Sequence, residues 1–333
     1  MKALVCRRFG PLDDLQLEEC PVPQPGPGQV CIQTGAVSLN FPDVLISRGD
    51  YQVRPALPFS PGAELAGVIR AVGAGVSGWR VGDRVLASTG YGALAESCVV
   101  DAWRLVPLPD EVGFDLACTL VVTYGTVLHA LQRCVVSQPG QTLLVCGAAG
   151  GIGTAAVQVG HALGLKVIAA VSSEDKAMYC RDLGADAVVS YAQPEALKER
   201  VMALTQGQGA DLVLDPVGGA YGLQALRCLG WRGCYLVVGF AAGEISRFPL
   251  NLALLQERRI QGVYWGEAIR KDPQAYRDIV GQLLAWVAQG RLTPVVSERI
   301  RLEDAVQGLQ RLARREVRGK VVVTFKDTGL PAR

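Results

Sequence analysis

The strongest constraint on the fold is a glycine-rich segment between an apolar run and an alanine-rich run. From Val145 to Gly153 it reads Val-Cys-Gly-Ala-Ala-Gly-Gly-Ile-Gly. Residues 143–146 have the apolar pattern of a strand, residues 154–163 favour a helix, and residues 166–171 predict the next strand. The segment therefore predicts one strand–helix–strand unit of a parallel, doubly wound sheet.

Glycines at such a turn allow the backbone to bend tightly and to approach a diphosphate. The negative charge then lies against the N–H groups and the positive dipole end of the following helix. The turn predicts a dinucleotide site that includes Ala149, Gly150, Gly151 and Ile152. The alternative is a tight structural turn that binds no ligand.

The residues after the second strand indicate which dinucleotide is bound. NAD sites place an Asp or Glu about 20 residues beyond the glycines, where it accepts hydrogen bonds from the ribose 2′-OH. This chain has Ser172 and Ser173 there, and Lys176 follows on the next turn. Hydroxyls tolerate a 2′-phosphate and a lysine neutralises it, so NADPH is the expected cofactor. Alternatively, a serine only caps a helix that begins near Glu174, and Lys176 points to water.

Composition narrows the class of protein. The 333 residues suffice for two domains, and a net charge of +2 without a long basic run argues against a nucleic-acid partner. Turn residues and charges interrupt the apolar runs, so we expect a soluble chain with no membrane partner, and the first residues lack the apolar core of a signal peptide. The ten cysteines include no Cys-x-x-Cys pair, which is typical of reduced, buried thiols in a cytoplasmic protein.

The order of expected elements predicts the domains. Up to about residue 120 the chain has short strands separated by Gly and Pro, which is typical of a small barrel or sandwich. Strands and helices then alternate from 122 to 262, and the remaining residues are too few for a core of their own. We therefore expect one domain from 1–121 and 263–333 and a second from 122–262. Strands are expected at 30–34, 66–72, 84–87, 96–100, 187–189, 211–215, 234–238 and 320–325, and helices at 279–289 and 303–313.

Several short motifs occur in a set order along the chain. They are Asn40–Asp43, Arg48–Tyr51, Pro61–Val68, Val81–Val85, the glycine turn, Asp215–Gly219 and Arg318–Val322. Together they resemble, nearly end to end, the medium-chain dehydrogenase/reductase superfamily, and within it the zinc-free quinone oxidoreductase branch related to zeta-crystallin. The resemblance implies an α/β fold, with a doubly wound parallel (Rossmann) sheet domain and a GroES-like β-rich catalytic domain.

The zinc-dependent relatives need a Cys in the first motif, a His-Glu pair near residue 63 and a further Cys before the nucleotide domain. The corresponding positions hold Asn40, Ala63 and Thr119, with Cys118 beside the last. The chain has only two histidines, both on expected helices. A tetrahedral site of nitrogen and sulfur ligands therefore cannot be assembled from spaced residues, and we expect no metal.

Without a metal to polarise an alcohol, reduction is the expected direction. Quinones and activated alkenes accept hydride when they are bound beside the nicotinamide and the developing oxyanion is stabilised. Asn40, whose amide is a donor, and Tyr51, whose phenol donates a hydrogen bond or a proton, are the candidate catalytic residues. The alternatives are that Asn40 holds a loop and that Tyr51 is a wall of the pocket.

The resemblance also implies cofactor contacts. Thr123 is expected under the nicotinamide, Tyr191 and Lys176 beside the 2′-phosphate, Gly239 and Phe240 along the nicotinamide ribose, and Arg315 reaching the same phosphate from the last helix. Arg315 is alternatively an exposed helix charge. Tyr264 and Trp265 either line an aromatic substrate pocket or belong to the core.

These observations leave three functions open. The leading one is an NADPH-dependent reductase that transfers hydride to quinones in the interdomain cleft. The second is an NADPH-dependent reductase of α,β-unsaturated carbonyls or enoyl thioesters, in which Tyr51 would protonate the carbon beside the carbonyl. The third is an NADPH-binding protein without turnover. Apart from the small-molecule substrate, the expected partner is a second copy of the chain. The resemblance implies this, because relatives commonly form dimers through the edge of the nucleotide-domain sheet. That edge is expected here near residues 236–238.

Overall fold

The computed structural model describes residues 1–191 and 194–325, and internal contacts divide the chain into two compact units. Unit 1 contains residues 1–122, 266–290 and 294 onward, and unit 2 contains residues 123–265 and 291–293. The boundaries expected from the sequence, after 121 and after 262, lie one and three residues from those of the structure. Residues 291–293 join unit 2 through contacts that the sequence did not indicate.

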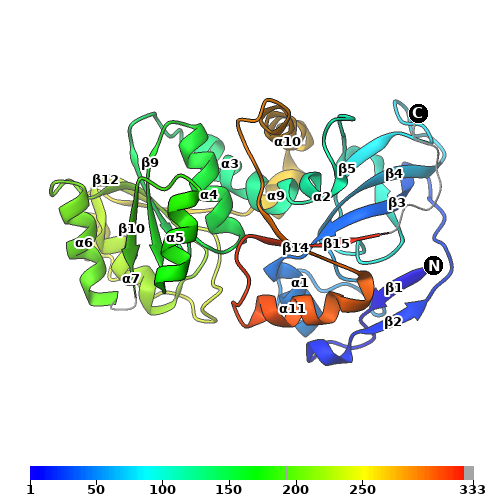
Figure 1. The fold of residues 1–333 in the computed structure, drawn as a ribbon, viewed down its shortest axis with the longest axis horizontal. Helices are drawn as coiled ribbons and strands as arrows, with labels where there is room; N and C mark the ends of the chain where they lie inside the picture. Colours follow the sequence, from blue (N-terminus) through cyan, green and yellow to red (C-terminus); the bar gives the residue numbers. More distant parts are fainter. Residues whose placement is uncertain (192–193, 326–333) are drawn as a thin grey trace. The chain divides into compact units, whose positions relative to one another are not determined.

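Unit 1 is rich in antiparallel strands. Its described residues form a seven-stranded sheet with the order β14-β15-β3-β4-β5-β7, in which β6 also pairs with β3, and a separate β1-β2 pair (Figure 1). The strands are β1 (Lys2–Val5), β2 (Gln16–Glu19), β3 (Gln29–Ser38), β4 (Glu64–Val72), β5 (Arg84–Ser88), β6 (Ser97–Asp101), β7 (Leu105–Pro107), β14 (Val296–Ile300) and β15 (Lys320–Thr324). The helices are α1 (Phe41–Arg48), α2 (Phe114–Ala117), α9 (Trp265–Lys271, which begins at the last residue of unit 2), α10 (Pro273–Ala288) and α11 (Ala305–Ala313).

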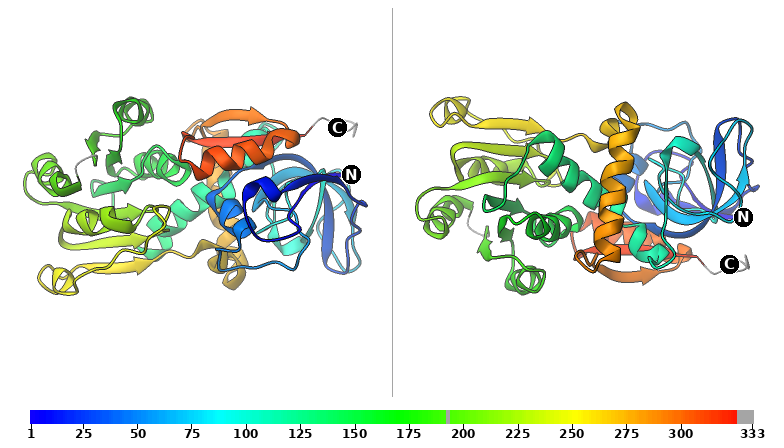
Figure 2. Two further views of the ribbon diagram at one scale, coloured as in Figure 1. Left: turned by 90° about the horizontal axis from the view of Figure 1, so that it is seen from below. Right: turned by 90° about the horizontal axis from the view of Figure 1, so that it is seen from above.

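The core of unit 1 lies on the inward face of these strands. Val30, Ile32 and Val37 of β3 and Leu65 and Ile69 of β4 are fully buried. Burial of one such side chain contributes about 1.5–3 kcal/mol. The C-terminal strand β15 pairs antiparallel with β3, and α11, orange-red in Figure 2, contacts α1. The last part of the chain therefore completes the sheet that its first part begins.

Unit 2 is a parallel sheet covered by helices. Its six described strands have the order β10-β9-β8-β11-β12-β13, with α4 and α5 on one side and α6 and α7 on the other (Figure 1). The strands are β8 (Thr142–Cys146), β9 (Lys166–Val171), β10 (Ala187–Ser190), β11 (Ala210–Asp215), β12 (Leu229–Val237) and β13 (Arg259–Gly262). The helices are α3 (Gly125–His129), α4 (Gly151–Ala162), α5 (Glu174–Asp182), α6 (Leu197–Leu204), α7 (Gly219–Arg227) and α8 (Asn251–Leu254). This strand order confirms the predicted doubly wound fold. The order reverses between β8 and β11, and the carboxyl ends of strands at such a switch point are where sheets of this class bind ligands.

A long apolar helical segment runs from Phe114 to Cys134 through α2, η3 (Leu120–Tyr124), α3 and η4 (Ala130–Cys134). Both η3 and η4 are π-helical. Among the described residues it is the one helix long and apolar enough to cross a membrane, so the expectation that every apolar run is interrupted is wrong here. Because 72% of its most apolar window is buried within the protein, it has the character of a core helix.

Candidate functional site

The glycine turn joins β8 to α4 at the carboxyl edge of the parallel sheet. Gly147 has a φ of 61°, a conformation that favours glycine. A Cβ atom on Gly153 would lie 2.3 Å from the carbonyl oxygen of Gly147, so only glycine allows the helix to pack this closely on the turn. The first N–H groups of α4 have no partner within the helix. The turn therefore fits a diphosphate, which would lie against Gly150, Gly151 and Ile152.

The neighbouring strand β11 ends in a carboxylate that is fully engaged. Oδ1 of Asp215 accepts hydrogen bonds from the backbone N–H groups of Val217 (2.7 Å) and Gly218 (3.1 Å), and Oδ2 accepts one from the Tyr235 hydroxyl. Burial raises the pKa of Asp215 and that of Tyr235. Asp215 therefore holds the turn that leads into α7, on the edge of the sheet that carries the glycine turn.

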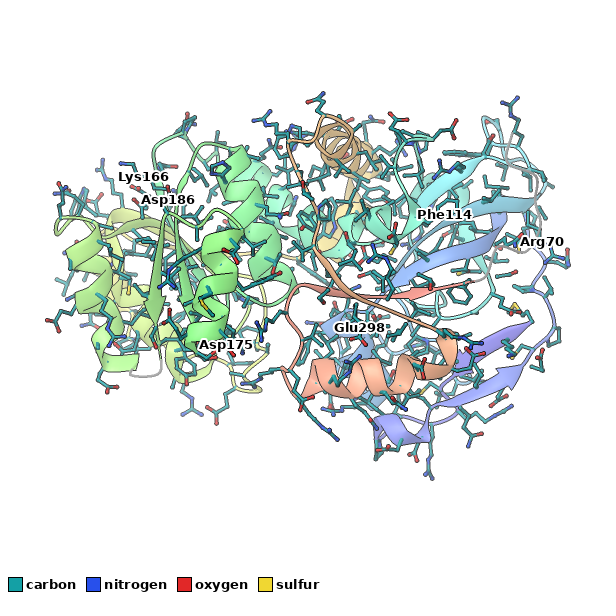
Figure 3. The ribbon with its side chains drawn as sticks, in the orientation of Figure 1. Arg70, Phe114, Lys166, Asp175, Asp186 and Glu298 are labelled. Atoms are coloured by element: carbon teal, nitrogen blue, oxygen red, sulfur yellow. The ribbon has the colours of Figure 1, made fainter. Side chains whose placement is uncertain are left out.

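The expected 2′-phosphate residues lie together after β9. Ser173 is the N-cap residue of α5, and Lys176 Nζ donates a hydrogen bond to Ser172 Oγ over 3.3 Å. Asp175, labelled in Figure 3, lies on the same first turn. Glu174, the acidic residue nearest to the ribose position of an NAD site, forms an ion pair with Arg181 (2.8 Å).

Tyr191 extends this group from the adjacent strand. Its backbone N–H donates to the carbonyl oxygen of Val171, the last residue of β9, over 2.9 Å. Its ring lies 4.8 Å from the ring of Tyr221 at the start of α7. The structure thus brings Ser172, Lys176 and Tyr191 to one end of the sheet. Arg315 belongs to unit 1, where it follows α11 with a φ of 60°, and its approach to a phosphate stays a prediction.

The three residues expected beside the nicotinamide and its ribose, Gly239, Phe240 and Thr123, differ in location and burial. Gly239 and Phe240 follow β12, and the Gly239 N–H donates to the carbonyl oxygen of Asp215 over 3.3 Å, so they share its edge of the sheet. Phe240 is 40% exposed. Thr123 lies in the π-helical segment η3 and is buried.

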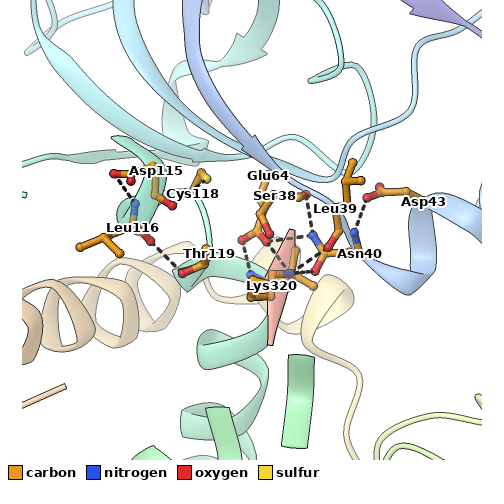
Figure 4. A network of polar contacts seen from close by, with 11 residues as sticks. Ser38, Leu39, Asn40, Asp43, Glu64, Asp115, Leu116, Cys118, Thr119 and Lys320 are labelled. Carbon is orange, nitrogen blue, oxygen red and sulfur yellow. Dashed lines mark hydrogen bonds and ion pairs between the residues drawn. The ribbon is translucent and has the colours of Figure 1, made fainter. Parts of the chain in front are cut away.

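Asn40 is the N-cap residue of α1 and is 3% exposed (Figure 4). Its Nδ2 donates to the carbonyl oxygen of Ser38 (3.0 Å) and to Oε1 of Glu64 (2.8 Å), while Oδ1 accepts from Lys320 Nζ (2.5 Å). An amide nitrogen has two hydrogens, and both are used. Donation to a substrate oxyanion would break one of these bonds, so the geometry favours a positioning role for Asn40.

The carboxylates around Asn40 form a buried polar cluster with Lys320. Oε2 of Glu64 accepts the backbone N–H of Val122 (2.7 Å), and Lys320 Nζ lies 3.6 Å from Oε1 of Glu64. Burial raises the pKa of Glu64 and lowers that of Lys320, and each charge opposes the shift of the other. Asp43 accepts the backbone N–H of Asn40 (2.7 Å), and burial raises its pKa to about 7. Sequence reasoning gave no role to Lys320, although its Gly-Lys motif was recognised.

No group of three or more His, Cys, Asp or Glu side chains in the described part of the chain is arranged to hold a metal ion. Near the buried cluster, burial raises the pKa of the Cys118 thiol well above its usual value. The two carboxylates of the cluster face the Lys320 ammonium. The donor set present here suits an ammonium rather than a zinc ion.

The aromatic candidates differ in exposure. Tyr51 is partly buried and packs against the apolar core of unit 1. Tyr264 is 50% exposed, whereas Trp265 is 6% exposed. The Trp265 ring lies 5.1 Å from the His129 ring, and a Cβ atom on Gly125 would lie 2.9 Å from the indole nitrogen. The core alternative is therefore favoured for Trp265, and the pocket role stays open for Tyr264.

Comparison with known proteins agrees with this arrangement. The family model for the alcohol dehydrogenase GroES-like domain matches residues 26–110, and that for zinc-binding dehydrogenase matches residues 151–286. A quinone oxidoreductase-like protein 2 homolog from Nematostella vectensis is 37% identical over 91% of this chain and 83% of its own length.

Two solved structures are similar along their whole length. The quinone oxidoreductase of Pseudomonas syringae has a TM-score of 0.91 at 32% identity and covers 97% of this chain and 99% of its own. The Escherichia coli quinone oxidoreductase, solved in complex with NADPH, has a TM-score of 0.92 at 26% identity and covers 98% of this chain and 100% of its own. These likenesses confirm the family to which the sequence motifs pointed.

Proposed function

Because the chain belongs to the zinc-free quinone oxidoreductase-like family of medium-chain dehydrogenases and reductases, and is thus an oxidoreductase, we propose that it reduces quinones with NADPH. The observation that carries the cofactor assignment is the Ser172–Lys176 pair, which offers a hydroxyl and an ammonium where an NAD site has a carboxylate. The buried cluster contains the Lys320 ammonium and no set of zinc ligands. A quinone fits such a site as substrate, because it accepts hydride without a Lewis acid.

Each part of the site has a role in this proposal. The N–H groups at the start of α4 hold the diphosphate, and Lys176 with Ser172 and Tyr191 binds the 2′-phosphate. When bound, NADPH supplies the hydride. The residues proposed along the nicotinamide are Thr123, Gly239 and Phe240, and Arg315 is proposed as a further phosphate contact.

Protonation separates the two substrate classes. The reduced oxygens of a quinone take protons from water, so quinone reduction needs no dedicated acid. Reduction of an enone or enoyl thioester needs a proton at carbon, and Tyr51 is the candidate donor. Because both amide hydrogens of Asn40 are bonded within the protein, Asn40 orients its neighbours and leaves Tyr51 as the candidate that meets the substrate.

The test is NADPH consumption by the purified chain with a para-quinone, a small enone and an enoyl-CoA in parallel. We expect turnover of the quinone, and Tyr51→Phe should change it less than about threefold, because water supplies the protons. Tyr91→Phe is the matched control, since Tyr91 is an exposed tyrosine of the same unit. Selective turnover of the enone or thioester that Tyr51→Phe abolishes would replace the proposal with an alkene reductase. NADPH binding without any turnover would also overturn it.

A second copy of the chain is the proposed protein partner. Strand β13 is one edge of the parallel sheet, opposite β10, and all four of its residues are exposed. Residues 236–237, near which the edge was expected, lie in β12, one strand further in. Three exposed leucines stand close to β13 in the sequence, at 250, 254 and 255. An unpaired edge beside exposed apolar side chains favours pairing with an identical edge.

A cytoplasmic location stays a prediction. All ten cysteines are free in the described part of the chain, and eight of them are buried. Burial raises the pKa of several of these thiols, for example that of Cys98 to about 12. Unreactive, reduced thiols suit a reducing compartment.

A further inference from the structure

The buried cluster of Asn40, Glu64 and Lys320 is hydrogen-bonded to the π-helical segment Leu120–Tyr124 through Glu64. We propose that Lys320 is a positioning residue: its ammonium orients Glu64 and Asn40, and through Glu64 it fixes the π-helical turn Leu120–Tyr124 that carries Thr123. The proposal rests on the proposed function only where it places Thr123 at the nicotinamide.

Lys320 is held as an internal cation. It is 3% exposed, and its Nζ lies 3.0 Å from the carbonyl oxygen of Leu39, 2.5 Å from Oδ1 of Asn40 and 3.6 Å from Oε1 of Glu64. Three oxygens therefore surround a group with three N–H donors. A buried ammonium is costly unless it is paired and hydrogen-bonded, so these contacts keep it in place.

Glu64 transmits this arrangement to the helix. Its side chain is fully buried, and both carboxylate oxygens are used: Oε1 faces Asn40 and Lys320, and Oε2 accepts the Val122 N–H. Val122 is the central residue of the π-helical segment. Short π-helical turns of this kind often occur at functional sites. The Glu64 carboxylate ties the middle of this turn to β4, and Thr123 is the next residue.

Loss of the Lys320 charge should disturb this link in a defined way. The positive charge lowers the pKa of Glu64 against the effect of burial. An ionised Glu64 offers two oxygens that only accept, one facing Asn40 and one facing Val122, whereas a protonated Glu64 carries an O–H that needs an acceptor of its own. Lys320 thus favours the ionised form of Glu64, in which the oxygen that faces Val122 is an acceptor only.

The experiment compares Lys320→Met, Glu64→Gln and the double variant in the full chain. Three quantities are measured: kcat with the acceptor that the wild type turns over, the Kd for NADPH, and amide hydrogen exchange in peptides spanning residues 114–134. We expect each single variant to lower kcat about 10- to 100-fold, as misplaced reacting groups do, to change Kd less than about threefold, and to accelerate exchange at Val122. The double variant, which has no unpaired charge, should recover part of the Val122 protection.

Tyr276→Phe is the control variant, because it also removes a buried polar group from unit 1. The Tyr276 hydroxyl donates to the carbonyl oxygen of Arg104 (2.9 Å) and accepts from the N–H of Ser88 (3.2 Å), which pairs with Glu64 across β4 and β5. The variant therefore removes a buried hydroxyl next to the cluster and leaves the Lys320 charge in place. This variant should melt at a lower temperature with unchanged kcat and Val122 exchange. Lys320→Met with the same behaviour would overturn the proposal, since Lys320 would then be only an ion-pair partner. If Lys320→Met does not fold, Glu64→Gln decides by the same criteria. The exchange measurement tests the link to Val122 even if quinones are not the substrates.

Discussion

The carboxylate of Glu64 accepts a hydrogen bond from the backbone N–H of Val122, with 2.7 Å between Oε2 and N. Glu64 is the first residue of β4, and Val122 lies in the middle of η3, 58 residues further along the chain. This bond joins a strand of unit 1 to a helical turn that departs from regular α geometry. The π-helical turn therefore has a side-chain partner at its middle residue, and turns of this kind are frequent at functional sites.

Reversing the charge beside the proposed 2′-phosphate should change cofactor preference. In Ser172→Asp with Lys176→Ala, a carboxylate replaces a hydroxyl and an ammonium is lost. Hydrogen bonds to charged groups contribute about 1.5–3 kcal/mol, so NADPH should bind about 10- to 100-fold more weakly, and NADH should gain relative to it. Titration of the nucleotide fluorescence measures both dissociation constants.

Lys166→Ala is the control for that pair, because Lys166 is an exposed lysine at the opposite end of β9 (Figure 3). It should leave both dissociation constants unchanged. An unaltered NADPH preference in the Ser172 and Lys176 double variant would mean that the 2′-phosphate binds elsewhere.

The glycine turn gives a second prediction. Gly153→Ala places a Cβ atom 2.3 Å from the carbonyl oxygen of Gly147, so α4 has to move away from the turn. Overpacking of this kind costs about 1–3 kcal/mol, and NADPH binding should weaken about 10- to 100-fold. Gly281→Ala in α10 is the control: its Cβ has no atom within 4 Å, and the variant should be about 0.5–1 kcal/mol more stable. Wild-type affinity in Gly153→Ala would exclude this turn as the diphosphate site.

Much of the nucleotide-binding unit could be predicted from the sequence because its signals are local. The run 166–171 was predicted with the bounds that β9 has, and the strands at β8, β10 and β11 were each found to within one residue at either end. Helix α4 begins at Gly151, three residues before the expected start, because its first turn is made of the glycines that also form the bend. Strand β13 was missed, and so was β14 of unit 1, since their residues alternate weakly and depend on a neighbouring strand.

The candidate site was harder to predict because its contacts join distant residues. Helix α1 was not expected, although Asn40, Pro42 and Asp43 are typical of a helix start: Asn40 is the N-cap residue and Asp43 accepts its N–H. The link between Asn40 and Lys320 spans 280 residues, and no local pattern encodes it. The residue types at the motif positions indicated that zinc ligands are missing, but only the fold shows that the carboxylates of Glu64 and Asp43 face the Lys320 ammonium.

The exposed edge strand leads to a prediction about assembly. If two copies pair along β13, Ile260→Lys should place a charge in the interface and yield a monomer in light scattering coupled to size exclusion. Ile260 is 41% exposed in the single chain. Val136→Lys adds the same charge to an exposed apolar side chain outside β13 and should leave the dimer intact. A monomeric wild type at every concentration tested would contradict the proposed pairing.

Asp43 should make the stability of the protein depend on pH. Burial raises the pKa of Asp43 from 3.8 to about 7, so between these values the folded state binds more protons than the unfolded chain. The slope of the unfolding free energy with pH is then negative, and Asp43 favours folding least above pH 7. Asp43→Asn keeps an oxygen to accept the Asn40 N–H but does not titrate. The stability of the wild type minus that of the variant should therefore fall by about 3 kcal/mol from pH 4 to pH 7 in urea titrations, and it should level off above about pH 8. Glu64 and Lys320, the charged groups that face Asp43, are present in both proteins, so a difference that stays constant with pH would show that Asp43 is ionised throughout this range.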